Sequence, residues 1–316
     1  MGQKLAALGG RSAPSNLACV CLDLDGTLLC SDHRCHPTSV ATLRKLHSRG
    51  IQVMLCTGRS PSSLVEVLAD LDLPDVPVVC MNGTAGFVFR TPPPLSALAS
   101  HPMSFSVTLT PALIASVAAA TGDDNLPLQL YSADGTIYCS ANPDNAAEVA
   151  IMKRYETLTG TKQKVVDLPS LLSLAETTQF QKMLVLTGDD RVTLVHDLLA
   201  GSVQPQHQCT LIKGSPSWFV EVLPAGANKG EGLRRMCAKL DLDVGQCVAM
   251  GDGNNDVEFV AVAGWGVSMK NGTAEVKAAA NEVCAFTNDE LGVSKFLEDF
   301  MERGLQTATV NSFLKK

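Results

Sequence analysis

The sequence has no apolar run that approaches the ~20 residues needed to cross a bilayer. It also has no excess of basic residues, because 25 lysines and arginines face 32 aspartates and glutamates and leave a net charge of −7. This balance argues against nucleic acid or an anionic membrane surface as the main partner. We therefore predict a soluble protein that binds neither nucleic acid nor a membrane.

The 11 cysteines do not show the paired spacing of a disulfide framework. Their number is odd, and Cys19, Cys21, Cys56 and Cys80 lie inside apolar runs that resemble buried strands. This pattern is typical of small apolar side chains in a reducing compartment, so we expect a cytoplasmic protein. The first 16 residues lack the apolar core of a signal peptide, and we expect residues 1–16 to form a disordered tail.

One short loop contains zinc-ligand residue types, namely Cys30, His33, Cys35 and His36. It is too short to close four ligands in the usual paired spacing, and no second pair follows nearby in the sequence. We interpret it as a polar loop beside a functional site.

The most informative stretch is residues 17–29, where an apolar run leads into Asp23, Asp25, Gly26 and Thr27. The run predicts a strand buried on both faces, and ligands of open parallel sheets bind beyond the carboxyl ends of such strands. Two carboxylates spaced by two residues would face the same side and repel, and this repulsion would be relieved by a bound cation or by protonation of one of them. Asp23 could then attack phosphorus, and Asp25 could serve the leaving group. An ordinary strand-to-turn exit remains the alternative.

Three further polar segments follow predicted strands or begin predicted helices. Thr57-Gly58-Arg59 follows a strand at 51–55, and its hydroxyl and backbone N–H groups suit a phosphate. Lys229 leads into a helix, where a lysine can hold a carboxylate ionised and bind a phosphate oxygen. Residues 251–256, Gly-Asp-Gly-Asn-Asn-Asp, follow a strand at 246–250 and offer hard oxygen ligands for Mg²⁺.

Between these segments the pattern of predicted helices and strands changes. We predict a helix at 37–48, a strand at 76–81 and a stiff proline linker at 91–94. Beyond the linker we predict an α+β region, with helices at 111–121, 145–159 and 190–200, a hairpin at Asp134-Gly135, and strands at 181–186, 209–212 and 218–223.

Taken in order, these motifs resemble those of the haloacid dehalogenase (HAD) superfamily, and most closely its Cof-type, subfamily IIB phosphatases. The resemblance covers residues ~17–300. It implies an α/β fold, with a doubly wound parallel-sheet core at 17–88 and 223–316. An α+β type IIB cap at 89–222 would select the substrate.

The resemblance also implies site residues and a cofactor. Asp23 would be the nucleophile, Asp25 the acid/base, and Lys229 a catalytic and phosphate-binding cation. The other implied phosphate-binding residues are Thr57, Gly58 and Asn255. The implied ligands of Mg²⁺ are Asp23, Asp25, Asp252 and Asp256.

The implied function is a Mg²⁺-dependent phosphatase that hydrolyses a small phosphate ester, such as a sugar phosphate, through an aspartyl-phosphate. The presence of Asp25 disfavours a dehalogenase. A mutase of the phosphomannomutase type would need cap arginines, and we predict only Arg90, Arg154 and Arg191 there. A non-catalytic binding protein would be expected to have lost an acidic ligand. We expect a monomer or a weak homodimer.

Overall fold

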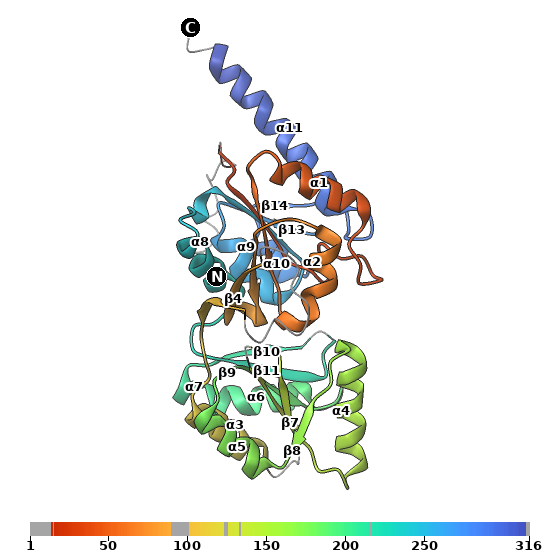
Figure 1. The fold of residues 1–316 in the computed structure, drawn as a ribbon, viewed down its shortest axis with the longest axis vertical. Helices are drawn as coiled ribbons and strands as arrows, with labels where there is room; N and C mark the ends of the chain where they lie inside the picture. Colours follow the sequence, from red (N-terminus) through yellow and green to blue (C-terminus); the bar gives the residue numbers. More distant parts are fainter. Residues whose placement is uncertain are drawn as a thin grey trace.

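The computed structural model describes residues 14, 16–89, 101–122, 126–132, 134–214 and 216–313, with the side chains omitted for 304–313. Figure 1 shows two sheets, one above the other along the longest axis of the molecule. Apart from residues 14 and 16, the predicted tail at 1–16 lies outside the described residues. The proline linker at 91–94 also lies outside them.

The first sheet has eight strands in the order β14-β13-β12-β1-β2-β3-β4-β5. Pairing is parallel from β14 to β3 and antiparallel for β3–β4 and β4–β5. The strand bounds are β1 Cys19–Leu22, β2 Gln52–Cys56, β3 Val76–Cys80, β4 Ala85–Phe89, β5 Met103–Ser106, β12 Cys247–Gly251, β13 Trp265–Ser268 and β14 Glu282–Val283.

Helices cover both faces of this sheet, as the doubly wound prediction requires. One face packs against α1 (Pro37–His47), α2 (Val65–Leu71) and α11 (Gly292–Phe313). The other packs against α8 (Lys229–Lys239), α9 (Val257–Val262) and α10 (Ala274–Ala279). The predicted α/β core is therefore confirmed, and the helix expected at 37–48 ends one residue earlier than predicted.

The second sheet has six strands in the order β10-β11-β9-β6-β7-β8, all antiparallel except for the β7–β8 pair. Its strands are β6 Leu128–Ser132, β7 Ile137–Ser140, β8 Lys164–Val166, β9 Phe180–Leu186, β10 Thr210–Lys213 and β11 Phe219–Leu223. The hairpin predicted at Asp134-Gly135 joins β6 to β7.

The helices of this region are α3 Pro111–Thr121, α4 Ala146–Thr159, α5 Leu168–Thr177, α6 Val192–Ser202 and α7 Gln204–His207. Apolar residues of α3, α5 and α6 pack on one face of the second sheet. The helix α5 was not predicted, although Asp167 caps its first turn and Pro169 lies at its start.

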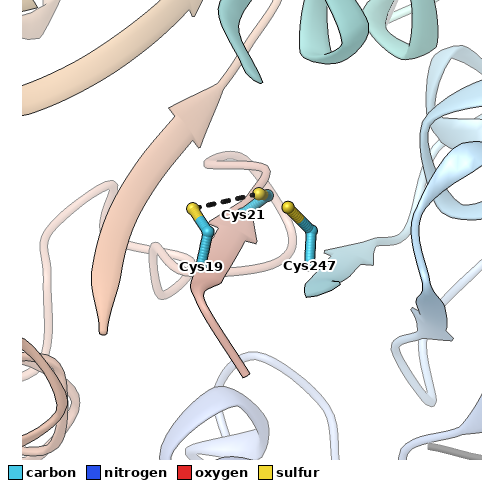
Figure 2. Close-up of side chains that lie close together, drawn as sticks. All are labelled: Cys19, Cys21 and Cys247. Atoms are coloured by element: carbon cyan, nitrogen blue, oxygen red, sulfur yellow. Dashed lines mark hydrogen bonds between the residues drawn. The ribbon is translucent and has the colours of Figure 1, made fainter. Parts of the chain in front are cut away.

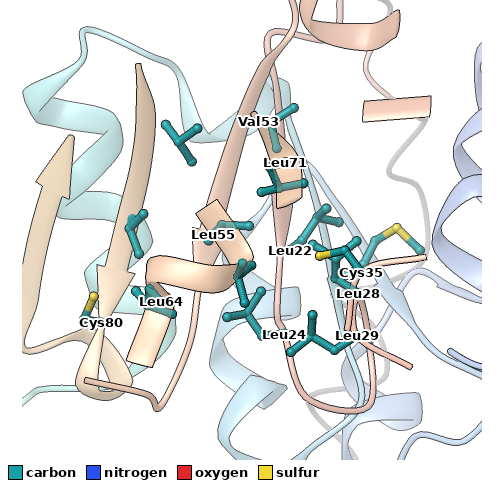
Figure 3. Packing of buried hydrophobic residues seen from close by; sticks show 14 of the residues in the cluster. Leu22, Leu24, Leu28, Leu29, Cys35, Val53, Leu55, Leu64, Leu71 and Cys80 are labelled. Carbon is teal, nitrogen blue, oxygen red and sulfur yellow. The ribbon is translucent and has the colours of Figure 1, made fainter. Parts of the chain in front are cut away.

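The loop that follows β1 is anchored by three buried leucines. Leu24, Leu28 and Leu29 are at most 2% exposed and belong to the same cluster as Leu22 and Leu55. Figure 3 shows these side chains packed together beneath the loop. Burial of Leu24, which lies between the two aspartates of the loop, fixes the backbone on both sides of it.

The domain boundary predicted at residue 89 does not coincide with the sheets. The strand β5 lies within the range 89–222 assigned to the cap, yet it pairs with β4 of the first sheet. The second sheet ends with β11 at Leu223, at the predicted return to the core. Of the described helices, none is long and apolar enough to cross a membrane.

Candidate active site

Four polar segments meet at the carboxyl edge of the first sheet because the strands that precede them are neighbours in register. Leu22 of β1 pairs with Leu55 of β2 and with Met250 of β12. The residues that follow these strands therefore leave the sheet at the same edge. They include Asp23, Thr57 and Asp252.

Asp23 lies at the centre of this edge and is 5% exposed. Its Oδ1 accepts a hydrogen bond of 2.6 Å from Nζ of Lys229, which also donates to Oδ1 of Asp256 at 2.7 Å. Burial and the charge of Asp256 raise the pKa of Asp23 well above its usual value, although Lys229 opposes this effect. Burial also opposes the charge of Lys229, but Asp23 and Asp256 outweigh it and raise its pKa.

The start of α8 places this lysine. Asn228 caps the helix by accepting a hydrogen bond of 2.8 Å from the backbone N–H of Glu231, so Lys229 occupies the first helical position. Gly83 lies against the same turn, and a Cβ at this glycine would come within 2.0 Å of the carbonyl oxygen of Asn228. Asn82-Gly83 therefore packs against the turn that positions Lys229.

Asp252 and Asp256 come from the loop after β12. Oδ2 of Asp256 accepts the backbone N–H groups of Asp252 and Gly253 at 3.0 and 2.9 Å. Thr27 donates to Oδ1 of Asp252 at 2.8 Å. Burial and the charge of Asp256 raise the pKa of Asp252 to about 6. These hydrogen bonds hold the loop and do not use Oδ2 of Asp252, which could bind a cation.

The residues present fit a divalent cation. Carboxylate oxygens of Asp23, Asp252 and Asp256 lie within 4.8 Å of one another, and the cation Lys229 neutralises only part of their charge. Gly26 has φ +79°, and a Cβ there would come within 2.3 Å of Oδ2 of Asp252. Hard oxygen ligands beside a space that only glycine leaves open suit Mg²⁺.

Asp25 does not join this cluster, which corrects the expectation that its carboxylate would face the same side as that of Asp23. Nε of Arg59 donates to Oδ2 of Asp25 at 2.7 Å, Nη2 donates to Oδ1 at 2.5 Å, and Nδ1 of His33 lies 3.4 Å from Oδ1. The reason is that β1 ends at Leu22, so strand alternation no longer applies after Asp23. Although burial opposes it, Arg59 holds the pKa of Asp25 below its usual value.

Thr57 follows β2, and Asn255 lies in the loop after β12, next to Asp256. Thr57 is 1% exposed, and its hydroxyl accepts the backbone N–H of Arg59 at 3.1 Å. Nδ2 of Asn255 donates to Oδ1 of Asn82 at 2.9 Å. The carbonyl of Gly58 accepts a hydrogen bond of 3.1 Å from Lys182 of the second sheet.

Sequence reasoning gave no role to Arg59, Asn82 or Glu221, which all contact residues of this edge. Arg59 belongs to the segment Thr57-Gly58-Arg59 after β2, and Asn82 follows β3 at the same edge of the sheet. The position of Asn82 at a strand end was the signal that could have identified it. Nothing in the local sequence marks Glu221.

The loop considered for zinc has other contacts. His33 reaches Asp25, and Nδ1 of His36 accepts the N–H of Thr38 to cap α1. Cys35 is buried in the apolar cluster beneath the loop. Among the described residues, these side chains do not form a metal-ligating group.

A group of three cysteines lies deeper in the first sheet. The Sγ atoms of Cys19, Cys21 and Cys247 lie within 4.8 Å of one another (Figure 2). All three are fully buried among apolar residues beneath α8 and α9. Hydrogen bonds from Cys21 and Cys247 lower the pKa of Cys19 to about 6, and hydrogen bonding and burial raise that of Cys21. Cysteines buried in this way among apolar side chains behave as small apolar residues. We interpret the cluster as apolar packing.

The profile of the haloacid dehalogenase-like hydrolase family matches residues 20–297 of the chain. The HMP-PP phosphatase of Cronobacter sakazakii is 26% identical over 257 residues, which cover 81% of this chain and 85% of that relative. An uncharacterised hydrolase of Schizosaccharomyces pombe is 24% identical over 289 residues, which cover 89% of this chain and 90% of that relative.

Solved structures share the fold. A haloacid dehalogenase-like hydrolase from Bacteroides thetaiotaomicron superposes with a TM-score of 0.72 at 22% identity, covering 90% of this chain and 99% of that structure. A sugar phosphatase of HAD subclass IIB superposes with a TM-score of 0.70 at 20% identity, covering 90% and 98%. At these identities the likeness concerns the fold alone.

Proposed function

The chain belongs to the haloacid dehalogenase-like hydrolase family and is one of its phosphatases, and we propose that it hydrolyses a small phosphomonoester through an aspartyl-phosphate with Mg²⁺ as cofactor. One observation carries this proposal. A buried aspartate, Asp23, lies 2.6 Å from a buried lysine and beside two further carboxylates at the carboxyl edge of a parallel sheet.

Asp23 is the proposed nucleophile. Its Oδ1 is held by Lys229, which fixes the orientation of the carboxylate and favours its ionised, nucleophilic form. The ammonium group of Lys229 also provides a positive charge for an equatorial phosphate oxygen in the transition state. Thr57, Gly58 and Asn255 are the proposed donors to the other phosphate oxygens.

Mg²⁺, when bound by Asp23 and Asp252 with support from Asp256, would offset the negative charge of the phosphate as it meets these carboxylates. We do not include the carboxylate of Asp25 among the ligands, because Arg59 engages both of its oxygens.

Asp25 is the proposed acid/base. Its contacts suit the role of base. A carboxylate held ionised by Arg59 can take a proton from the water that hydrolyses the aspartyl-phosphate. To protonate a leaving group in the first step, Asp25 must first gain a proton. Loosening of the Arg59 contact when substrate binds would raise its pKa and allow this.

We propose that the second sheet and its helices form the cap that selects the substrate, with the first connection moved from residue 89 to the segment after Ser106. Joining Ser106 to Pro224 through a short glycine-rich linker should leave a core that still folds cooperatively. A product without a cooperative unfolding transition would contradict this division.

The substrate is proposed to be a small phosphorylated metabolite, such as a sugar phosphate, in keeping with the names of the related phosphatases. A mutase would need a guanidinium for a second phosphate. Arg154 instead pairs with Asp189 at 2.6 Å and lies over the ring of Trp218. Arg90 lies outside the described residues. The 11 free thiols are in keeping with a reducing compartment, and we propose the cytoplasm.

The test is phosphate release from a panel of phosphorylated metabolites and from p-nitrophenyl phosphate. We expect turnover with Mg²⁺, none in excess chelator, and none with Ca²⁺, whose larger coordination sphere would engage Asp23 with both oxygens. The variant Asp23→Asn is the control for contaminating phosphatases. Turnover that survives in this variant or in chelator would contradict the proposal.

A further inference from the structure

A line of polar contacts runs from the second sheet to the proposed phosphate site. Lys182 of β9 lies with its Nζ 3.5 Å from Oε1 of Glu221 on β11. Oε2 of Glu221 accepts a hydrogen bond of 2.7 Å from Nδ2 of Asn82. Oδ1 of Asn82 in turn accepts one of 2.9 Å from Nδ2 of Asn255. Two residues of the second sheet are thus linked to an amide of the loop after β12.

The two charged members are buried and face the first sheet. The side chains of Lys182 and Glu221 are only 4% and 11% exposed. Lys182 also donates to the carbonyl of Gly58 at 3.1 Å and lies 4.9 Å from the ring centre of Tyr131. A buried ion pair is expensive to desolvate and contributes little net stability, so stability alone does not explain this pair.

The order of donors and acceptors in this line has one consistent direction. An ionised carboxylate can only accept, so Glu221 requires the nitrogen end of the Asn82 amide. The oxygen end of Asn82 is then left for Asn255, which must present its own nitrogen. This nitrogen carries a second proton that Asn82 does not use. The orientation of both amides therefore follows from the charge state of Glu221.

The backbone keeps Asn82 in place for this task. Its φ of 54° and ψ of 38° lie in the left-handed region, which asparagine tolerates better than most residues with a Cβ. Its backbone N–H donates to the carbonyl of Thr57 at 3.0 Å. With the backbone fixed, the side-chain amide can still turn over, so the contacts of its two ends decide which way it points.

We propose that Glu221 is a positioning residue of the active site, which acts through Asn82 to orient the amide of Asn255 with its nitrogen available to a phosphate oxygen. This inference rests on the proposed role of Asn255 in phosphate binding. It means that the phosphate site is complete only when the second sheet is docked on the first. Docking of the cap and assembly of the phosphate site are then one event.

The substitution Glu221→Gln provides a sharp test because it should reverse the relay. Lys182 can only donate, so it attracts the oxygen of the new amide and leaves the nitrogen toward Asn82. Asn82 then has to turn its oxygen to this nitrogen, and Asn255 has to turn its own oxygen toward Asn82. The matched control is Lys182→Met with Glu221→Gln, in which the new amide is free to present its oxygen to Asn82.

Two readouts on the full-length protein separate the relay from the function. The first is the side-chain amide signal of Asn255 in ¹H–¹⁵N spectra, assigned by its loss in Asn255→Ala. The second is the affinity for inorganic phosphate in Mg²⁺ buffer, measured by calorimetry without turnover. In Glu221→Gln we expect the amide signal to move and phosphate binding to weaken about tenfold, the loss expected for one hydrogen bond to a charged ligand. In the double variant we expect both to return close to wild type.

The dependence on Asn255 is the decisive comparison. In an Asn255→Ala background, Glu221→Gln should weaken phosphate binding no further, because the relay has lost its last member. An unmoved Asn255 signal in Glu221→Gln, or equal weakening in both backgrounds, would overturn the positioning role. If the wild type neither binds phosphate nor releases it from esters, the proposed function fails, while the amide signal still decides whether the relay exists.

Discussion

Arg59 holds Asp25 through two hydrogen bonds, with Nε 2.7 Å from Oδ2 and Nη2 2.5 Å from Oδ1. Asp23, two residues earlier, is held instead by Lys229. The two aspartates of the loop after β1 thus have separate cations. This separation keeps Asp25 ionised while Asp23 shares its lysine with Asp256, so the two carboxylates can titrate in different ranges.

The first prediction concerns the pH profile of Arg59→Met. Arg59 lowers the pKa of Asp25, so its loss should raise this pKa and leave less ionised base at acidic pH. With p-nitrophenyl phosphate, whose leaving group needs little protonation, the acidic limb of kcat should move to higher pH. At pH values well above the pKa of Asp25 in both the wild type and the variant, kcat should change far less. An acidic limb that stays in place would show that Asp25 is not the group that titrates there.

The parts of the site that could be predicted from the sequence are those in which each residue acts at the end of its own strand. Asp23, Thr57 and Asp252 each directly follow a buried apolar run, and parallel pairing brings such ends together. The direction of Asp25 could not be obtained this way. It depends on where β1 ends and on an arginine that follows a different strand.

Contacts between the two sheets could not be predicted either. Glu221 lies in a strand whose sequence, Phe-Val-Glu-Val-Leu, indicates only alternation, and its partner Asn82 is 139 residues away. Likewise the strand β5, which lies inside the range assigned to the cap, was not predicted, because the pairing of a four-residue strand is decided by its neighbour β4 and not by its own composition.

A second prediction concerns stability. Lys229 is 1% exposed between two carboxylates, so Lys229→Met leaves Asp23 and Asp256 buried without their cation. We expect the free energy of unfolding to fall by about 3–5 kcal/mol, as for other buried pairs that lose one partner. Urea denaturation measures it. The exposed Lys239 at the other end of α8 is the matched control, and Lys239→Met should change stability by less than about 1 kcal/mol.

A third prediction links pH, stability and Mg²⁺. The folded protein raises the pKa of Asp252 from 3.8 to about 6, so between these values it binds more protons than the unfolded chain does. The contribution of Asp252 to stability is therefore largest below this range and is lost as the pH rises through it. Mg²⁺ binds the ionised carboxylates, so it should raise the melting temperature more at about pH 8 than at about pH 5.

The control for this third prediction is Asp252→Asn. Removal of the titrating carboxylate should flatten the loss of metal-free stability between about pH 4 and pH 6. It should also weaken stabilisation by Mg²⁺, because one ligand has lost its charge. Equal stabilisation by Mg²⁺ at both pH values, in the wild type, would mean that the cation does not bind at these aspartates.

The last prediction separates Asp23 from Asp25 by role. Asp23→Asn removes the proposed attacking oxygen, so no phosphoenzyme should form. Asp25→Asn should still allow slow attack on an aryl phosphate and then stall, because no base activates the water. Mass spectrometry of enzyme quenched in acid should therefore find a phosphate adduct on the peptide that contains Asp23 in the Asp25→Asn variant.

The two variants form a matched pair, because each replaces a carboxylate by a nearly isosteric amide in the same loop. They also differ in what they leave behind: Asp23→Asn leaves Lys229 still paired with Asp256, whereas Asp25→Asn leaves Arg59 without its carboxylate. Circular dichroism and thermal unfolding check that both are folded. An adduct in Asp23→Asn would show that another group attacks phosphorus. Wild-type turnover in Asp25→Asn would show that the water needs no base at this position, and that Arg59 holds Asp25 for some other purpose.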